Sequence, residues 1–288
     1  MVGWRTGAVL SINASQSSFT NWAAGGQNSI SLNGLTSLFA NYKTKRSGWD
    51  NTLDLGYGKQ HQGKEIGWLK TDDKIDFSSK YGQMASKEWF CAGLLNFKSQ
   101  FDDGFKYPND SVPISRFLAP AYIIAAVGMD YKPSKYFSAF VAPATAKTTI
   151  VKDQTLADAG AFGVEKAVLD GNGAVVTPGK NIRNEFGGYV KIAFQKDELV
   201  KNINLTTKLD LFSNYLENPK NVDVSWEVLI AMKVNKYITA TISTHLLYDD
   251  DVDIAIDKDK DGTPEKMAPR TQFKQVIGVG LSYKFASK

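Results

Sequence analysis

Cysteine is almost absent from this chain, since Cys91 is the only one among 288 residues. A single cysteine excludes an internal disulfide framework and a zinc site built from cysteines. Histidine is nearly as scarce, and His61 and His245 lie too far apart in the sequence for a metal-ligand spacing. The P-loop, the G-x-S-x-G nucleophile motif and the dinucleotide glycine fingerprint are missing as well. We therefore expect no catalytic residue and no enzyme.

Long hydrophobic runs and an excess of one charge are also lacking. No apolar run approaches the ~18 residues that a membrane-spanning helix needs. The 34 basic and 30 acidic residues leave a net charge of +4, dispersed along the chain, which argues against nucleic acid as a partner. A hydrophobic content of 43% argues against disorder. No signal peptide is visible, so an exported protein would be the mature form.

What the sequence does contain is alternation with a period of two from end to end, which is typical of β-strands. The clearest example is the segment 271–285. Its apolar residues, among them Phe273, Ile277 and Leu281, fall on one face, whereas Lys274 and the glycines fall on the other. No stretch has a convincing helical period.

The alternation predicts about twelve strands in one domain, 1–288. Most reach the ~9–11 residues that a tilted membrane-spanning strand requires. We predict an all-β fold, a transmembrane antiparallel up-and-down β-barrel. A soluble β-sandwich or lipocalin-like barrel is the alternative, and it would turn the apolar face inward. The predicted strands are 4–13, 28–43, 49–61, 72–83, 88–100, 121–132, 135–149, 184–195, 202–215, 222–234, 237–248 and 271–285.

The connections between these strands alternate in length. Tight links are expected near 44–48, 84–87, 133–134, 196–201 and 235–236. The other set is longer, at 14–27, 62–71, 101–120, 150–183 and 249–270, and only 216–221 in it is short. Short turns on one side and long loops on the other are typical of bacterial outer-membrane barrels, with both termini on the periplasmic side.

Aromatic residues lie near the predicted periplasmic ends of the strands, namely Trp49, Trp89, Tyr136, Tyr237 and Phe285. Such residues form girdles at the level of the lipid headgroups. Phe285 also ends an alternating last strand, which resembles the signal that the barrel-assembly machinery reads. The pattern predicts an outer-membrane location with the lipid bilayer as a partner.

Short motifs spread over nearly the whole chain carry a family resemblance. They are the segments 15–16 (SQ), 21–26 (NWAAGG), 49–51 (WDN), 57–58 (YG), 71–74 (TDDK), 117–120 (FLAP), 128–131 (GMDY), 214–215 (NY), 222–227 (VDVSWE), 232–237 (MKVNKY), 248–250 (YDD) and 272–285 (QFKQVIGVGLSYKF). On these segments the chain resembles a family of Bacteroidota outer-membrane proteins classified as a domain of unknown function. The resemblance implies an outer-membrane barrel, but it brings no assigned activity.

The polar face of the strands is expected to line the lumen, and it carries both signs of charge in similar numbers. One interpretation is a ladder of ion pairs that fills a narrow interior, and the other is a polar pathway for a small solute. Twelve strands lie between small filled barrels and open porins, so size does not decide. The predicted lumen residues are Asp54, Lys74, Asp76, Lys98, Glu185, Lys191, Lys208, Asp210, Asp223, Glu227, Lys233 and Lys274.

An acidic segment in the last long loop has the D-x-D-x-D-G spacing of the start of a calcium loop. Asp257, Asp259 and Asp261 would supply carboxylates around one turn, and Gly262 allows the sharp bend. The acidic residue usual at loop position twelve is missing, because Ala268 stands there. A calcium site and a solvated acidic loop are the two interpretations.

Two further features invite a functional interpretation. Ser243 and His245 share a strand face, as in some membrane-embedded hydrolases, but no partner that would orient the histidine is evident. The first long loop contains the segment 21–26, in which Asn21, Trp22, Gly25 and Gly26 could fold inward as a plug or offer a partner surface. A compact, self-packed loop is the simpler interpretation.

These observations lead to one functional hypothesis and two alternatives. We expect a non-enzymatic outer-membrane barrel with a narrow, charge-paired lumen that binds or passes a small solute. The alternative is an accessory barrel that docks with protein partners in a larger outer-membrane complex. A lipid-modifying enzyme is a remote third hypothesis.

Overall fold

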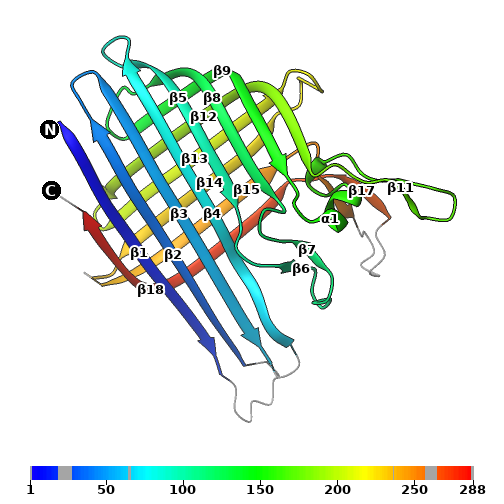
Figure 1. Ribbon diagram of the computed structural model, residues 1–288. Helices are drawn as coiled ribbons and strands as arrows, with labels where there is room; N and C mark the ends of the chain where they lie inside the picture. Colours follow the sequence, from blue (N-terminus) through cyan, green and yellow to red (C-terminus); the bar gives the residue numbers. More distant parts are fainter. Residues whose placement is uncertain (1, 19–27, 64–65, 236, 257–264, 287–288) are drawn as a thin grey trace.

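Twelve long antiparallel strands form a closed barrel in the computed structural model (Figure 1). The structure describes residues 2–18, 28–63, 66–235, 237–256 and 265–286. Around the ring the strand order is β1-β18-β15-β14-β13-β12-β9-β8-β5-β4-β3-β2. The barrel strands are β1 (Gly3–Ser17), β2 (Ser29–Lys43), β3 (Ser47–Gln62), β4 (Ile66–Met84), β5 (Trp89–Ser99), β8 (Ala121–Tyr131), β9 (Phe137–Ile150), β12 (Ile182–Val200), β13 (Ile203–Asn214), β14 (Asp223–Lys233), β15 (Ile238–Tyr248) and β18 (Gln272–Ala286).

The all-β class, the closure of the ring and the twelve strands predicted from the alternation are confirmed. Each strand pairs with its neighbour in the chain, and β18 closes the ring on β1 through the register from Gly7 opposite Ala286 to Asn13 opposite Gly280. Because the ring is closed, the barrel has no continuous free sheet edge.

The alternation places apolar side chains on the outside of the barrel. In β18, Phe273, Ile277 and Leu281 are each more than 60% exposed. On β14 and β2, Trp226 and Leu32 are likewise exposed. A water-soluble barrel would bury this face, so the exposed apolar wall requires another apolar environment around it.

One predicted connection is wrong. The segment 62–71 was expected to be a long loop, but β3 runs to Gln62 and β4 begins at Ile66. The β3–β4 register shifts between Gly58 and Lys59, so that Lys59 lies opposite Lys70. This bulge breaks the period of two and hides the strand from the sequence pattern.

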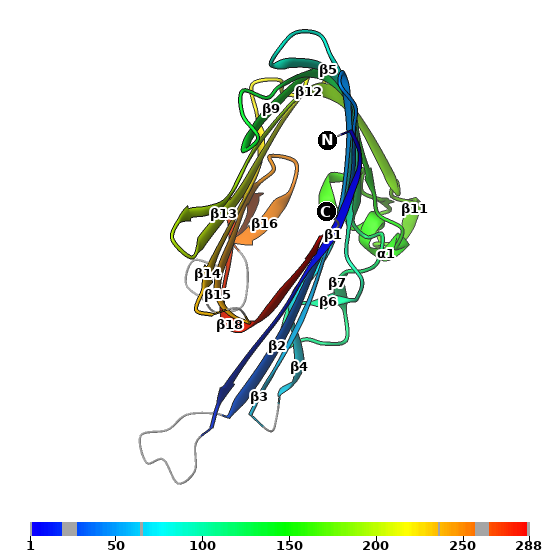
Figure 2. The ribbon, with the colours of Figure 1, turned by 90° about the vertical axis from the view of Figure 1, so that its left-hand side faces the viewer.

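The strands β1–β4 continue past the rest of the barrel at the end that carries the long loops (Figures 1 and 2). The pairing of β1 with β18 stops at Asn13, and the pairing of β4 with β5 begins only at Ile75. Beyond these points the four strands form a projecting sheet. We call it the β1–β4 extension; it comprises residues 14–17, 29–32, 59–62 and 66–71.

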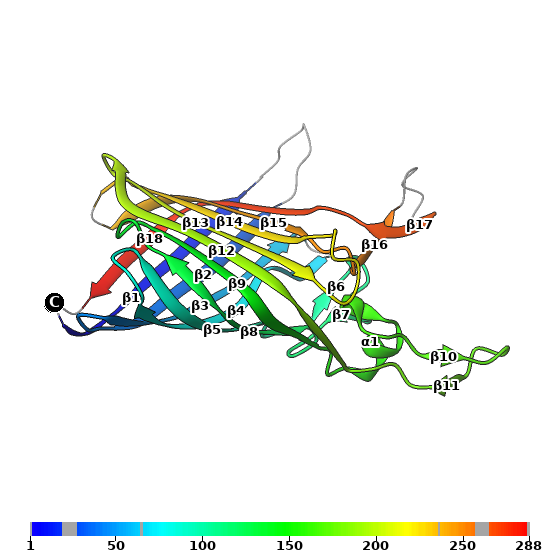
Figure 3. The same cartoon turned by 90° about the horizontal axis from the view of Figure 1, so that it is seen from above.

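Short elements fill the long loops, and Figure 3 shows α1, β10, β11, β16 and β17 at the end opposite the C-terminus. The hairpins are β6 (Gly104–Phe105) with β7 (Pro113–Ser115), β10 (Val168–Leu169) with β11 (Val175–Thr177), and β16 (Asp253–Ile256) with β17 (Lys266–Pro269). The helices are α1 (Gln154–Asp158) and the short 3-10 helix Ala161–Gly163.

The expectation of no helix is therefore wrong for one loop. The Asp153 side chain accepts a hydrogen bond from the Leu156 backbone N–H and caps α1, and the chain leaves the helix where Gly160 takes a φ of 73°. A helix of five residues is too short to show a helical period in the sequence. Among the described residues, no helix has the length and apolar character that a membrane crossing would need.

Candidate functional site

Most of the predicted lumen residues lie in a network of ion pairs inside the barrel. The network joins strands that are not neighbours, so its side chains meet across the lumen. Lys233 is the exception, since it lies exposed at the turn end of β14, outside this network. Lys274 lies nearer the loop end, where its Nζ is 2.7 Å from Asp72 Oδ1 on β4.

Two ion pairs connect opposite walls of the barrel. Lys74 Nζ on β4 lies 2.7 Å from Glu227 Oε2 on β14, and Lys208 Nζ on β13 lies 2.8 Å from Asp54 Oδ2 on β3. In each pair the two strands are six steps apart in either direction around the twelve-stranded ring. We call these the trans-lumen pairs. These direct contacts between opposite walls narrow the lumen at this level.

Asp210 on β13 is the centre of a second group beside the trans-lumen pairs. It accepts hydrogen bonds from Lys191 Nζ at 2.9 Å, Lys98 Nζ at 3.2 Å and the Tyr189 hydroxyl at 2.6 Å. Asp76 joins the network through Asn96, whose Nδ2 donates at 2.7 Å. Every one of these carboxylates has a cationic or hydrogen-bonding partner, as buried charges require.

A third group lies nearer the loop end and is rich in acids. Lys147 on β9 lies 2.7 Å from Asp223, 3.4 Å from Glu185 and 3.7 Å from Asp249. Arg183 follows on β12, 2.6 Å from Asp251 and 3.4 Å from Glu185. The two cations therefore stand among more carboxylates than they can neutralise.

The turn end of the lumen holds a fourth group that the sequence reasoning missed. Lys80 Nζ lies 2.7 Å from Asp130, which is 1% exposed, and Lys132 bridges Asp130 at 3.3 Å and Asp50 at 3.1 Å. Ser138 also donates to Asp130 at 2.7 Å. The alternation puts Asp50 on the same face of β3 as Asp54, and Lys80 on the same face of β4 as Lys74, so the sequence contained the pattern that assigns these two charges to the lumen.

Lys147, Arg183 and Asp72 were not predicted either. Arg183 and Asp72 share the alternating face of Glu185 and Lys74, which were predicted, whereas Lys147 follows a bulge in β9 that moves the lumen face from even-numbered residues such as Phe140 to odd-numbered ones. For Arg183 and Asp72, the sequence indicated the lumen face of the strand but not the ion-pair partner of each residue.

Apolar side chains fill the lumen between the charged groups on the side of β5–β13. Phe140 and Tyr189 are almost fully buried and meet edge to face with ring centroids 6.4 Å apart. Lys80 and Lys147 each place their Nζ over an aromatic ring of this cluster, Phe140 at 5.8 Å and Phe212 at 4.9 Å respectively. The cluster comprises Ala92, Leu94, Ala126, Phe140, Ala142, Tyr189 and Phe212.

His245 is paired with a serine other than Ser243. Its Nε2 lies 3.0 Å from Ser225 Oγ and 4.0 Å from Glu227 Oε1. In a serine–histidine–acid triad, the carboxylate must hold the nitrogen opposite to the one that faces the serine. Here both groups approach the same nitrogen, so the arrangement does not form a triad.

Two sets of predicted site residues fall outside the described residues. These are the calcium candidates Asp257, Asp259 and Asp261, and the first-loop residues Asn21, Trp22, Gly25 and Gly26. Within the described part of the chain, no group of three or more histidine, cysteine, aspartate or glutamate side chains is arranged to hold a metal ion.

Solved outer-membrane proteins align with the chain at low similarity. An outer membrane channel from Pseudomonas putida F1 is 9% identical over 100% of this chain and 96% of that chain, with a TM-score of 0.41. The translocator domain of the autotransporter NalP from Neisseria meningitidis is 9% identical over 98% and 88%, with a TM-score of 0.35. The CymD monoaromatic hydrocarbon channel is 11% identical over 99% and 89%, also with a TM-score of 0.35. Likenesses this weak carry no argument about function, and the barrel rests on its own strand pairing.

Sequence comparison finds one family model that matches part of the chain. No sequence among curated proteins matches the chain. The Bacteroidota origin implied by the resemblance stays a prediction. Residues 14–105, from the end of β1 to β6, match the model of a family described as a protein of unknown function, DUF3078.

Proposed function

We propose that this chain is an outer-membrane barrel that passes or binds a small polar solute through a narrow lumen, which the trans-lumen pairs hold closed in this conformation. The membrane location is supported by the apolar outer wall. Barrel strands of 11–19 residues are long enough to cross the hydrocarbon layer at a tilt. Lipid acyl chains would supply the apolar environment that this wall needs.

The aromatic side chains support the same location. At the turn end, Trp4 packs on Tyr42 and Trp49 with ring centroids 5.2 and 5.9 Å apart. Trp89 packs on Tyr131 at 4.8 Å. Indole and phenol rings favour the boundary between lipid tails and headgroups. Both termini and the short turns would then face the periplasm, and the barrel-assembly machinery would read the strand that ends near Phe285.

The solute path is supported by the partial solvent exposure of the trans-lumen pairs. The trans-lumen pairs are made by long side chains whose exposed fractions are 21–29%. They retain contact with solvent, and a rotamer change of the two lysines would separate the walls. A passing polar or charged solute could replace each partner in turn. A purely structural barrel gains less from such pairs, because a buried ion pair is rarely more stable than an apolar core.

Conductance in planar lipid bilayers tests the proposal. The variant Asp54→Ala, Lys74→Ala, Lys208→Ala, Glu227→Ala removes both trans-lumen pairs. We expect rare, small openings from the wild-type barrel and steady conductance from this variant. If both proteins leave the bilayer closed, and it stays closed after the loops 100–120 and 151–181 are shortened, the solute path is wrong.

The accessory barrel remains the second candidate, because the apolar cluster around Phe140 and Tyr189 fills part of the lumen. Stable co-purification with another outer-membrane protein, together with a closed bilayer, would favour it. We expect no enzymatic activity from either form.

A further inference from the structure

The ion-paired charges of the lumen balance in the middle and at the turn end, but not at the loop end. Among the described residues, four lysines face four carboxylates in the middle of the lumen, and the group around Asp130 has two of each. At the loop end, two cations face four carboxylates, which leaves two negative charges in excess. We call this group the acidic mouth; it comprises Lys147, Arg183, Glu185, Asp223, Asp249 and Asp251.

Three aspartates of the acidic mouth are accessible from the side of the loops. Asp223 begins β14, and Asp249 and Asp251 follow the end of β15, both at the loop end of the barrel. Their side chains are 19%, 22% and 30% exposed. Lys147 and Glu185, by contrast, are buried. A solute that arrives from the loop side can therefore reach the three aspartates.

The surroundings of Lys147 show which kind of cation the acidic mouth accommodates. Its Nζ lies 2.7 Å from Asp223 and 3.7 Å from Asp249, and 4.9 Å from the centre of the Phe212 ring. An aromatic face attracts an ammonium ion, and carboxylates beside it neutralise the charge. No acidic, histidine or cysteine side chains in the described part of the chain are grouped to hold a metal ion. The geometry fits an ammonium better than a metal.

Two hydroxyl groups beside the acidic mouth have no hydrogen-bond partner among the described residues. Thr149 is 2% exposed and follows Lys147 on the lumen face of β9. It lies opposite Arg183 on β12 and Tyr122 on β8. The Tyr122 hydroxyl in turn interacts electrostatically with Asp249. A buried hydroxyl without a partner costs free energy, and a primary ammonium brings three N–H donors that such oxygens can accept.

We propose that the acidic mouth is the entry site for the solute, and that this solute carries a primary ammonium group, which takes Asp223 and Asp249 from Lys147. The inference rests on the proposed function and names the class of its solute. The two excess negative charges attract a cation and repel an anion. Lys147 keeps Glu185, 3.4 Å away, so the exchange leaves no carboxylate of this set without a cation.

Saturation-transfer NMR of the full-length barrel in a non-ionic detergent tests the proposal. The probe is 1,4-diaminobutane, and succinate, with the same number of carbons and the opposite charge, is the control ligand. We expect saturation transfer to diaminobutane and none to succinate. The double variant Asp223→Asn, Asp249→Asn should weaken diaminobutane binding about tenfold, because it removes two charge-assisted hydrogen-bond acceptors.

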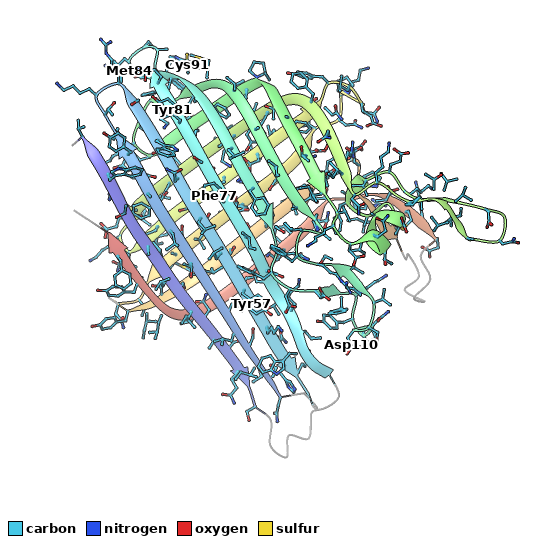
Figure 4. The ribbon with its side chains drawn as sticks, in the orientation of Figure 1. Tyr57, Phe77, Tyr81, Met84, Cys91 and Asp110 are labelled. Carbon is cyan, nitrogen blue, oxygen red and sulfur yellow. The ribbon has the colours of Figure 1, made fainter. Side chains whose placement is uncertain are left out.

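The matched control replaces two exposed loop acids outside the acidic mouth, in the double variant Asp110→Asn, Glu165→Gln. Figure 4 labels Asp110, which lies on the loop between β6 and β7. This control variant should bind diaminobutane as the wild type does. Circular dichroism and heat-modifiability show that each variant is folded.

A lysine variant tests the exchange itself. Lys147→Met removes the internal ammonium that competes with the solute, so diaminobutane should bind about tenfold more tightly. Lys180→Met removes a lysine from an exposed loop pair and should not change binding. Equal binding in these two variants would show that the solute does not replace Lys147.

Three other outcomes would overturn the proposal. They are equal binding by the aspartate variant and its control, saturation transfer to succinate, and displacement of diaminobutane by calcium at the same concentration. The variants leave the trans-lumen pairs intact, and binding is measured without conduction. Absent binding together with a conducting quadruple variant would refute the ammonium class alone, whereas binding without conduction would refute the solute path alone.

Discussion

At the scale of single residues, the trans-lumen pairs set this barrel apart from one with charges scattered on an open lumen wall. Lys74 and Glu227 are 153 positions apart in the sequence and meet at 2.7 Å. Their charges are partly shielded from water by the surrounding network, which strengthens the attraction relative to a surface pair. Each trans-lumen pair is therefore expected to contribute more to the free energy of unfolding than an exposed ion pair does.

A double-mutant cycle measures this contribution. For Lys74→Met and Glu227→Gln, we expect a coupling free energy of ~1–3 kcal/mol, because each single variant leaves the other charge without its partner. The measurement is reversible urea unfolding in lipid vesicles. Lys180 and Glu165, a loop pair in which both side chains are 66% exposed, serve as the control, with coupling below ~0.5 kcal/mol. Equal coupling in the two cycles would show that the trans-lumen contact does not form in the membrane.

At the scale of the strands, the β4 part of the β1–β4 extension is the feature that the sequence did not reveal, whereas most of its β2 and β3 parts lie in the predicted strands 28–43 and 49–61. Its β3 and β4 strands remain paired beyond the barrel, with Gln60 opposite Leu69 and His61 opposite Trp68. The hydrogen-bonded backbone predicts slow amide exchange there. An ordinary long loop would exchange at the rate of an open chain.

Hydrogen exchange with mass spectrometry tests this difference. We expect the amides of 68–71 to exchange at least ~100-fold more slowly than those of 109–112, which lie in the loop between β6 and β7. The matched comparison within the sheet is 76–80, which pairs on both sides. If 68–71 exchange as fast as 109–112, the extension is a loop and the prediction from the alternation was right after all.

The strands themselves were predictable because one face of each must be apolar and the other polar. This requirement imposes the period of two on most of the barrel wall, although bulges interrupt it in β4 and β9. The extension was hidden by the bulge beside Lys59, which shifts the period, and by the polar, glycine-containing segment 62–65. The helix α1 was not predicted because its five residues are too few to show a helical period.

The site was predictable only in part. Alternation assigns Lys208 and Asp54 to the lumen face, but it contains no information on which opposite residue each one meets. That choice depends on the shape of the closed ring and on the level of each residue along the axis. The apolar cluster was missed because inward residues such as Phe140 and Phe212 depart from the expectation of a wholly polar lumen.

At the scale of the whole molecule, orientation in the membrane is the next property to establish. In a Cys91→Ser background, Ser111→Cys places a thiol in the loop between β6 and β7, and Ser134→Cys places one in the turn between β8 and β9. Both positions are exposed. We expect a membrane-impermeant maleimide to label Ser111→Cys on intact cells and Ser134→Cys only after the outer membrane is permeabilised. The opposite pattern would reverse the orientation.

The central claim is that ion pairs join opposite walls and close the lumen, and zero-length cross-linking tests it most directly. A water-soluble carbodiimide activates a carboxylate, and a lysine amine in contact with it then forms an amide bond and releases a urea. In isolated outer membranes we predict, after proteolysis and mass spectrometry, the amides Lys74–Glu227 and Lys208–Asp54. Lys191–Asp210, which joins the neighbouring strands β12 and β13, is the internal control. Recovery of the control amide without either trans-lumen amide would contradict the account.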